Sequence, residues 1–485
     1  MSTEATLALL GTQAFIDGRW QPGDSAFDVI NPASRERLAS VEQPSLAQAQ
    51  AAIDAAERAL PDWRDRPAHE RSALLRRWFD LIIANQEALA RLLTSEQGKP
   101  LAEARGEVRY GAAFVEWFAE EARRVEGDII PSAGRDRRTL VLRQAVGVCA
   151  AITPWNFPVA MVTRKIAPAL AAGCSIVLKP AEQTPLCALA LARLALEAGI
   201  PAGVFNVLPA DSARSVEIGR LLCASTVVRH LSFTGSTEVG RLLMAQCAPT
   251  VKRLAMELGG HAPFIVFNDA DLEAALDGAM LAKYRNAGQT CVCANRFLIQ
   301  AGLHDAFVRG LTERTARLIT GAGYEPGVQV GPLIDDAAVA KVMRHIEDAR
   351  QMGARIETGG KTSGTGFVQP TVLSGVTPDM LIAREETFGP VAAIMKFETV
   401  EEAIALANAS ESGLAAYFYS RDLGQVWQVA EKLEYGMIGI NTAAISYETV
   451  PFGGIKQSGF GREGSRYGLE EYVSLKYLCM AGLPG

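Results

Sequence analysis

The segment Gly288–Cys293, Gly-Gln-Thr-Cys-Val-Cys, contains a cysteine whose thiol could do chemistry. It follows a stretch with helical spacing and precedes the apolar run Phe297–Ile299. A thiol on such a loop, where a glycine frees the backbone, can attack a carbonyl carbon as the thiolate. The alternative is a buried structural thiol, which is the commoner state of a lone cysteine. Cys291 therefore needs companions before it can be assigned as a nucleophile.

Two other segments contain groups that such a nucleophile would need. Met256–Gly260 carries Glu257 directly after a predicted strand, inside an apolar, glycine-rich turn. Desolvation there raises the pKa of a carboxyl group, so Glu257 could serve as a general base near neutral pH. Pro154–Pro158 holds Asn156 between two prolines that restrict the backbone, and its side-chain amide could donate to an oxyanion. Taken alone, each segment would be interpreted as an ordinary turn.

Two further segments are suited to a nucleotide. Phe233–Gly240 places a glycine turn between a strand and a helix, where free backbone amides attract phosphate. Its spacing is not the G-x-G-x-x-G fingerprint, so the pattern by itself is weak. Lys179–Glu182 supplies a cation and a carboxylate at another strand end, and a carboxylate there can bind ribose hydroxyls. An exposed Lys–Glu pair is the alternative for that segment.

The elements that would position these groups alternate between strand and helix from Gly147 onward. This alternation predicts a parallel sheet covered on both faces, whose ligands bind at the carboxyl ends of the strands. We therefore expect the segments that follow these strands to meet in one site. The predicted strands are Val148–Ile152, Ser175–Lys179, Val204–Leu208 and His230–Phe233, and the predicted helices are Ala160–Ala171, Thr184–Ala198, Ser212–Cys223 and Thr237–Cys247.

The flanking regions predict scaffold and a second unit. Ala14–Trp20 is strand-like, Ser45 and Gln48 can form a capping box, and Glu70–Leu93 and Leu101–Val125 have helical spacing. A second α/β unit is predicted from Glu257 to about Gly464. Its predicted strands lie near Pro263–Phe267, Arg296–Ile299 and Ala392–Phe397. The strand-like segments Thr139–Val146 and Glu471–Cys479 are predicted to build an oligomerisation appendage.

Together the chain resembles the aldehyde dehydrogenase superfamily over nearly its whole length, most closely the succinate-semialdehyde dehydrogenases. Seven motifs in the family's order carry the resemblance: Thr153–Pro158, Lys179–Glu182, Phe233–Gly240, Glu257–Gly260, Gly288–Cys291, Glu386–Pro390 and Pro451–Gly454. The resemblance implies an α/β fold with two Rossmann-like parallel-sheet domains and a small β oligomerisation hairpin. The implied dinucleotide-binding domain comprises 1–125 and 147–256, the catalytic domain 257–464, and the oligomerisation domain 126–146 and 465–485.

The resemblance also implies a role for each motif. Cys291 would form a thiohemiacetal with the aldehyde, and Asn156 with the Cys291 backbone amide would form the oxyanion hole. After hydride transfer to the nicotinamide, Glu257 would activate the water that hydrolyses the thioester, so the product would be a free acid. No metal site is predicted. The implied cofactor-binding residues are Thr153, Trp155, Lys179, Glu182, Gly235, Ser236, Leu258, Glu386 and Phe388.

The substrate class follows from three residues that match the subfamily's carboxylate-binding group. These are Arg164, Arg285 and Ser446. One or two guanidinium groups that hold a remote carboxylate would keep the aldehyde near Cys291. Each arginine alone is more often a surface or salt-bridge residue. Together they favour a small anionic aldehyde, a four- or five-carbon semialdehyde acid such as succinate or glutarate semialdehyde.

Cofactor choice and a thiol switch are further hypotheses. Glu182 should repel a 2′-phosphate and accept hydrogen bonds from an unmodified ribose, which favours NAD, while Lys179 leaves NADP as a second cofactor. If the loop is extended, Cys291 and Cys293 point the same way and a reversible disulfide can form. The alternative is that Cys293 simply packs beside the nucleophile. His261 stands where many relatives have Asn, and we assign it no role.

Composition and charge limit the partners. The 485 residues are 49% hydrophobic and 21% charged with a formal net charge of −6, so we expect no nucleic-acid partner. No apolar run reaches the roughly 18 residues of a membrane span, and Met1–Trp20 lacks a secretory signal pattern. Eight dispersed cysteines fit a reducing cytosol better than a disulfide framework. We predict a cytoplasmic enzyme that binds no membrane and forms a homodimer or homotetramer.

Four other functions compete with this interpretation. A cysteine hydrolase would need a histidine base, and none of the five histidines belongs to a recognisable catalytic pattern. A non-catalytic nucleotide-binding relative could have lost Cys291 or Glu257, yet both are present. CoA-acylating and phosphorylating relatives often lack the water-activating glutamate. An aldehyde dehydrogenase of broader specificity is the remaining alternative.

Overall fold

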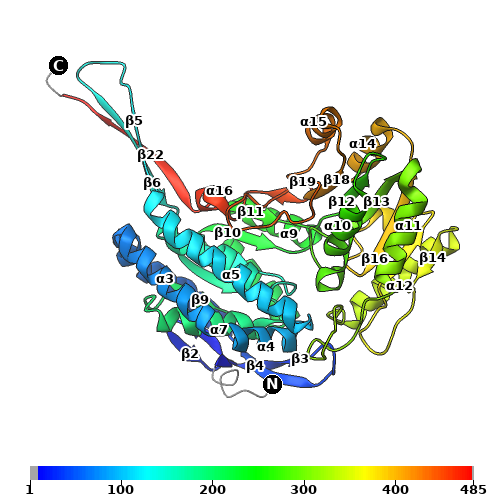
Figure 1. Ribbon diagram of the computed structural model, residues 1–485. Helices are drawn as coiled ribbons and strands as arrows, with labels where there is room; N and C mark the ends of the chain where they lie inside the picture. The colour runs from blue at the N-terminus through cyan, green and yellow to red at the C-terminus, as the bar shows by residue number, and fades with distance from the viewer. Residues whose placement is uncertain (1–8, 483–485) are drawn as a thin grey trace.

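Two large sheets and one small projecting sheet organise residues 9–482, the part of the chain that this computed structural model describes (Figure 1). The fold is α/β with parallel-sheet domains, as the sequence predicts. Residues 1–8, where no secretory signal is predicted, and 483–485, which close the predicted hairpin domain, lie outside the described range.

The first sheet has the order β2-β1-β9-β8-β7-β10-β11-β21. Its five central strands are parallel, and the edge strands pair antiparallel. Their carboxyl ends therefore open on one side, where the predicted motifs begin. The strands are β1 (Ala14–Ile16), β2 (Arg19–Gln21), β7 (Val148–Ile152), β8 (Ser175–Lys179), β9 (Phe205–Val207), β10 (Val228–Thr234), β11 (Arg253–Glu257) and β21 (Gly459–Phe460).

Helices cover both faces of this sheet because its strands are apolar on both sides. In β7, Cys149 and Ala151 belong to one buried cluster and Val148 and Ala150 to another. One face packs against α3 (Ala68–Ala84), α4 (Gln86–Gln97), α5 (Leu101–Glu121), α6 (Ala160–Ala172) and α7 (Pro185–Glu197). The other packs against α2 (Leu46–Asp65), α8 (Ser212–Ala224) and α9 (Thr237–Cys247).

The second sheet has the order β14-β15-β16-β13-β12-β18-β19 and is parallel except at β14. The strands are β12 (Ala262–Val266), β13 (Ala294–Gln300), β14 (Arg355–Thr358), β15 (Thr371–Ser374), β16 (Val391–Phe397), β18 (Ala415–Tyr419) and β19 (Met437–Ile440). One face packs against α10 (Leu272–Tyr284) and α11 (Ala301–Thr315). The other packs against α12 (Asp336–Gln351), α13 (Leu381–Arg384), α14 (Val400–Asn408) and α15 (Leu423–Lys432).

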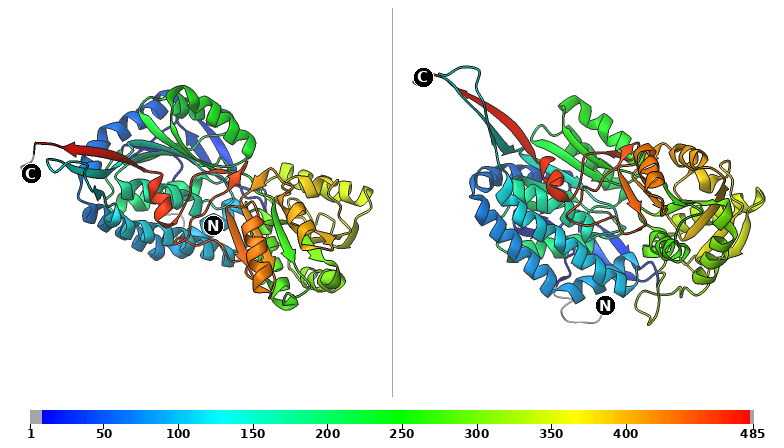
Figure 2. Two further views of the ribbon diagram at one scale, coloured as in Figure 1. Left: turned by 90° about the horizontal axis from the view of Figure 1, so that it is seen from above. Right: turned by 45° about the horizontal axis from the view of Figure 1, so that its top comes forward.

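A three-stranded antiparallel sheet, β22-β6-β5, projects away from both larger units (Figures 1 and 2). The pairing of β6 with β22 confirms that the two strand-like segments of the sequence meet, with Val473 opposite Ala145. The strands are β5 (Asp128–Ile130), β6 (Arg138–Ala145) and β22 (Val473–Met480). The remaining elements are β3 (Ser25–Ile30), β4 (Arg37–Gln43), β17 (Ser412–Gly413), β20 (Ile455–Lys456), α16 (Ser465–Glu470) and the short 3₁₀ segments 122–124, 248–250 and 285–288.

Two predicted elements near the N-terminus divide where a turn interrupts them. Ala14–Trp20 is a hairpin rather than one strand, because Asp17 and Gly18 both adopt positive φ and form a two-residue turn. Glu70–Leu93 is two helices, α3 and α4, because Asn85 ends the first and its side chain donates to the Leu81 carbonyl. The predicted capping box of Ser45 and Gln48 is confirmed.

The last part of the predicted second unit returns to the first sheet. β21 pairs antiparallel with β11, so the chain crosses back before residue 464. This return brings the segment 451–463 against the carboxyl end of β11, where Glu257 lies. Among residues 9–482, no helix is both long and apolar enough to cross a membrane.

Candidate active site

A left-handed turn introduces the loop that carries Cys291. Asn286, Ala287 and Gly288 adopt φ values of 52°, 55° and 75° in succession. The conformation costs roughly 1–2 kcal/mol for each of the two non-glycine residues, so other contacts must hold it. The Asn286 N–H donates to a Glu103 carboxylate oxygen at 2.8 Å. A Cβ at Gly288 would lie 2.3 Å from the Gly389 carbonyl oxygen, so glycine is required there.

The nucleophile segment is a tight turn and not an extended strand. The Cys293 N–H donates to the Thr290 carbonyl at 3.0 Å, which closes the turn around Cys291. The extended loop assumed for a Cys291–Cys293 disulfide is therefore wrong. The buried Cys293 thiol is directed instead at the carbonyls of Lys283 (3.6 Å) and Ala294 (3.7 Å). The thiol switch stays a prediction that this geometry does not favour.

Glu257 lies at the carboxyl end of β11, beside the nucleophile loop. A Cβ at Gly260 would lie 2.1 Å from the Cys291 carbonyl oxygen, which shows how closely the two loops approach. The Glu257 side chain is 3% exposed, and neither of its carboxylate oxygens has a hydrogen-bond partner among residues 9–482. Burial, and then the charge of Glu463, raise the pKa of Glu257 well above its ordinary value. Both effects favour the protonated form of this carboxyl group.

Glu463 belongs to a buried cluster of charges that adjoins Glu257. Its two carboxylate oxygens contact Arg164 Nη2 at 2.9 Å and Lys165 Nζ at 2.5 Å, and Lys165 also donates to Ser232 at 2.9 Å. Burial opposes ionisation of Glu463, yet Lys165 and Arg164 hold its pKa below the ordinary value. Glu463 thus carries the negative charge of the cluster, and Glu257 carries the proton.

The Cys291 thiol is neutral in this arrangement. Burial raises its pKa to about 12, the charge of Arg164 opposes this shift, and the carboxyl group of Glu257 adds to it. A thiolate at neutral pH therefore requires a proton acceptor or an added positive charge nearby.

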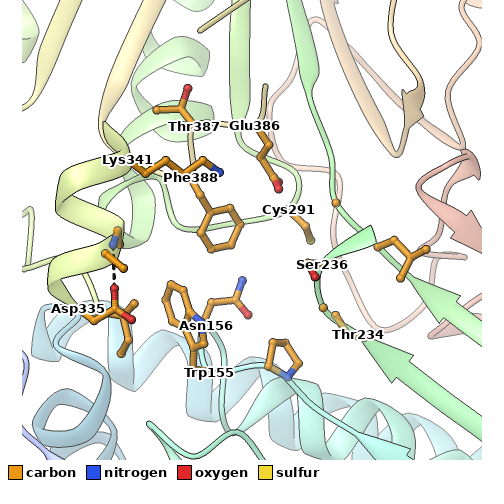
Figure 3. Close-up of a pocket in the computed structure, with 17 residues that line it drawn as sticks. Trp155, Asn156, Thr234, Ser236, Cys291, Asp335, Lys341, Glu386, Thr387 and Phe388 are labelled. Atoms are coloured by element: carbon orange, nitrogen blue, oxygen red, sulfur yellow. Dashed lines mark hydrogen bonds between the residues drawn. The ribbon is translucent and has the colours of Figure 1, made fainter. Parts of the chain in front are cut away.

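Asn156 follows β7 and faces the same cavity as Cys291 (Figure 3). Its backbone carbonyl accepts hydrogen bonds from Lys99 Nζ at 2.8 Å and from Asn286 Nδ2 at 3.0 Å. Its own side-chain amide donates to the Gln289 carbonyl at 3.1 Å. The amide is thus within reach of the nucleophile loop, and its second N–H remains able to donate to an oxyanion.

Two adjoining cavities fit the two halves of a dinucleotide. The nucleophile cavity, about 380 Å³, contains Cys291 and is lined by the predicted residues Trp155, Asn156, Gly235, Ser236, Leu258, Glu386 and Phe388. The α8–α9 cavity, also about 380 Å³, is lined by the predicted residues Thr153, Trp155, Lys179, Glu182, Gly235 and Ser236 and by apolar side chains of both helices. The two cavities share Pro154 and Trp155, which follow β7, and residues 234–236 at the N-terminus of α9, where free amides attract phosphate.

The donors and acceptors of these cavities suit ribose, phosphate and an aromatic ring. Lys179 Nζ lies 4.0 Å from Glu182 and donates to Ser215 at 3.0 Å. Glu386 accepts a hydrogen bond from the Gly260 N–H at 3.1 Å, and burial raises its pKa to about 7. Phe388 adopts a φ of 55°, and its ring meets that of Trp155 edge to face at 5.6 Å. These residues fit a nicotinamide dinucleotide.

A third cavity, about 190 Å³, lies on the other side of the nucleophile loop. Arg285 and Ser446 line it together with Thr290 and Val292, the neighbours of Cys291 in the chain. We call it the Arg285 cavity. The Arg285 guanidinium is exposed, lies over the Phe157 ring at 5.3 Å, and has no acidic partner among residues 9–482. An unpaired guanidinium beside the nucleophile is suited to a small anion.

The structure separates Arg164 from Arg285 and Ser446. Arg164 is buried, is paired with Glu463, and its guanidinium lies over the Phe452 ring at 4.0 Å. It does not line the Arg285 cavity. Of the three residues predicted to bind the carboxylate, two therefore share a cavity, while the charge of the third is already compensated.

Sequence reasoning missed several groups at this site. Lys165 could have been found from the sequence, because a second charged residue beside Arg164 in an apolar helix indicates a buried acidic partner. Glu463 and Tyr110 had none, since both reach the site only through the folding of distant segments. Lys99 and Glu107 form a buried ion pair that contacts the Asn156 loop, and no local sequence pattern indicates this pair.

A model of the aldehyde dehydrogenase family matches residues 20–478. The chain belongs to the aldehyde dehydrogenase family. It is 57% identical over 480 residues, 98% of each chain, to a 3-sulfolactaldehyde dehydrogenase of Pseudomonas putida. It is 56% identical to a glutarate-semialdehyde dehydrogenase of Pseudomonas aeruginosa, covering 98% of this chain and 99% of the other. It is 55% identical to an NADP(+) succinate-semialdehyde dehydrogenase of Escherichia coli, covering 97% and 98%.

Solved structures agree on the fold. The crystal structure of succinate-semialdehyde dehydrogenase from Burkholderia pseudomallei matches with a TM-score of 0.96 and 57% identity over 98% of each chain. A point mutant of betaine aldehyde dehydrogenase from Staphylococcus aureus, in complex with NAD+, matches with a TM-score of 0.94 and 37% identity over 98% of each chain. The fold of this aldehyde dehydrogenase is thus the family's, as predicted.

Proposed function

We propose that this aldehyde dehydrogenase oxidises a short semialdehyde that carries a carboxylate, succinate or glutarate semialdehyde, to the dicarboxylic acid. The observation that carries the proposal is the Arg285 cavity, where an unpaired guanidinium and the Ser446 hydroxyl lie beside the Cys291 loop. The three relatives are named for aldehydes with an anionic group at the other end. A carboxylate held at Arg285 would direct the aldehyde carbon toward Cys291.

The residues then act in sequence. The Cys291 sulfur bonds to the aldehyde carbon, its proton passes to a base, and the Asn156 amide and the Cys291 N–H stabilise the oxyanion. A bound nicotinamide supplies the acceptor for the hydride that leaves this carbon. Glu257, once deprotonated, takes a proton from the water that attacks the thioester, which releases the acid and restores the thiol.

The proposed cofactor is NAD, with NADP as a second acceptor. Glu182 stands in the α8–α9 cavity, where its carboxylate would accept hydrogen bonds from an unmodified ribose and repel a 2′-phosphate. Lys179 in the same cavity offers a positive charge that would moderate this repulsion. The NADP(+) relative supports the second acceptor.

The proposal includes the assembly and the location. β6 and β22 expose apolar side chains on a projecting sheet, which a second copy would cover in a homodimer or homotetramer. All eight cysteines are unpaired, as expected of a cytoplasmic protein.

The test is a substrate panel assayed with NAD and with NADP, on the native enzyme and on Arg285→Ala. The panel contains succinate semialdehyde, glutarate semialdehyde, 3-sulfolactaldehyde and the uncharged butanal. We expect Arg285→Ala to lower kcat/KM for the carboxylate substrates about 30-fold, mainly through KM, because a charge-assisted pair contributes about 2 kcal/mol. Butanal should react equally well with both enzymes, since it makes no use of the guanidinium.

Equal losses on butanal and on the semialdehydes would contradict the anionic substrate class. A native enzyme that prefers butanal would contradict it as well. A strong preference for NADP would overturn the argument from Glu182. A preference for 3-sulfolactaldehyde would mean that the substrate's anionic group is a sulfonate and not a carboxylate.

A further inference from the structure

One face of α5 reaches the loops of the active site. Residues 103, 107, 110 and 114 follow each other at spacings of four, three and four, which places them on one side of the helix. Glu103 accepts the hydrogen bond from the Asn286 N–H, and Glu107 accepts one from the Val159 N–H at 2.9 Å. Tyr110 continues this face toward the Arg285 cavity.

The Tyr110 hydroxyl contacts Ser446 directly. Its oxygen lies 2.5 Å from Ser446 Oγ, across 336 residues of sequence. The tyrosine ring meets Phe114 edge to face, with centroids 5.1 Å apart and an interplanar angle of 78°. It also packs against the buried cluster that contains Phe157, the ring beneath the Arg285 guanidinium. The ring is therefore fixed, and its hydroxyl has a defined position.

The Tyr110–Ser446 pair leaves one O–H free. Each hydroxyl has a single proton, and the contact uses one of the two. We assign the Tyr110 O–H as the donor and Ser446 Oγ as the acceptor, because a phenol is a stronger acid than an aliphatic alcohol. The Ser446 proton then stays available to the Arg285 cavity, and the incoming bond polarises it. A donor beside an unpaired guanidinium favours an anion.

We infer that Tyr110 is a positioning residue that sets the enzyme's preference for anionic aldehydes. It acts through Ser446, whose hydroxyl it orients and polarises toward the anionic end of the substrate. Without the phenol, the Ser446 hydroxyl rotates freely and loses its fixed direction. This inference rests on the proposed function, because it assumes that the substrate's anion occupies the Arg285 cavity.

The test compares Tyr110→Phe with the native enzyme on succinate semialdehyde and on butanal. We expect KM for succinate semialdehyde to rise about tenfold, the range of one hydrogen bond to a charged group, with kcat nearly unchanged. KM for butanal should not change. The control is Tyr324→Phe, because the Tyr324 hydroxyl contacts Ser95 Oγ at 2.8 Å, outside the three cavities. It should leave both substrates unaffected.

Ser446→Ala and the double variant test whether Tyr110 acts through Ser446. Ser446→Ala alone should also raise KM for succinate semialdehyde, and Tyr110→Phe should add nothing to it. Full additivity, a native KM in Tyr110→Phe, or equal losses on both aldehydes would each overturn the inference. If one of these outcomes occurs while Arg285→Ala still raises KM for succinate semialdehyde, the inference about Tyr110 fails and the proposed function stands. If Arg285→Ala has no effect, the proposed function itself has failed.

Discussion

Two buried carboxyl groups lie close together at this site, and their pKa values are shifted in opposite directions. Glu463 is paired with two cations, which lower its pKa, whereas Glu257 has no hydrogen bond and faces that negative charge. Of the two groups, Glu257 therefore holds a proton more strongly. Glu257 must lose this proton before it can act as the base that activates water. Thioester hydrolysis should therefore be faster at higher pH.

Glu257→Gln isolates this step. We expect it to form one equivalent of reduced cofactor per site in a burst and then to turn over about 10²–10⁴-fold more slowly, because only hydrolysis needs the base. Stopped-flow absorbance at 340 nm follows the burst and the steady rate. In the native enzyme kcat should rise with pH, since the pKa of Glu257 is raised, and this rise should vanish in the variant. A variant with neither a burst nor a slower steady rate would contradict the assignment.

The residues that sequence alone identified share a local signature, and those that it missed do not. Cys291, Glu257 and Asn156 each sit in a short motif next to a strand or turn. Glu463 lies 206 residues after Glu257 and reaches it only because the chain returns to the first sheet at β21. Tyr110 likewise meets Ser446, a residue that the sequence did identify, only across 336 residues of the chain. Charge compensation across such distances leaves no periodic pattern that a sequence could reveal.

At the scale of elements, the buried central strands were predictable because both their faces are apolar. The observed bounds of β7 and β8 equal the predicted ones. The left-handed run at residues 286–288 was not predictable, since Ala287 has no local reason to adopt a φ of 55°. It exists because α5 and the Asn156 loop hold it from outside, through Glu103 and the Asn156 carbonyl.

The buried Lys99–Glu107 pair is the contact through which α5 holds the Asn156 loop. Lys99 Nζ lies 2.5 Å from Glu107 and donates to the Asn156 carbonyl, while Glu107 caps the N-terminus of α6. Glu107→Gln would leave the Lys99 ammonium buried without a countercharge. We expect the free energy of unfolding to fall by about 3–5 kcal/mol. We also expect kcat to fall more than KM rises, since the oxyanion donor would be displaced.

Urea unfolding and steady-state kinetics measure these two effects. Glu120→Gln serves as the control, because Glu120 lies on the same helix but is exposed, with Arg76 at 4.0 Å. It should change stability by less than about 1 kcal/mol. A similar small loss in Glu107→Gln would mean that the buried pair does not hold the loop.

At the scale of the whole molecule, the strands of the projecting sheet were predictable from the sequence, but their position relative to the rest of the fold was not. The alternation of Glu471–Cys479 predicted a strand that joins Thr139–Val146 in one appendage, and the structure pairs the two strands antiparallel. The projection itself was not predictable, because it depends on where β6 and β22 leave the first domain (Figure 2). Ile129, Leu475 and Tyr477 stay exposed on it. Contact with a second copy, as proposed above, would bury them.

The response of the whole fold to acid follows in part from two of its three buried histidines. Burial lowers the pKa of His230 and of His261 to about 3. The ordinary value of about 6.5 applies in the unfolded chain, which therefore binds protons first as the pH falls. Stability is thus complete above about pH 6.5 and is lost progressively below it. At pH 5 each of these two histidines should lower the free energy of unfolding by about 2 kcal/mol.

His230→Leu tests this, because the imidazole is fully buried in β10 and neither ring nitrogen has a hydrogen-bond partner among residues 9–482. The ring packs edge to face on Tyr472 at 4.9 Å, a contact that leucine can largely replace. The difference in unfolding free energy between pH 7.5 and pH 5 should shrink by about 2 kcal/mol in the variant. The same change at His69 should leave the difference unaltered, since that side chain is exposed. If His230→Leu keeps the native pH dependence, His230 takes up its proton in the folded state, and the acid sensitivity must come from other groups.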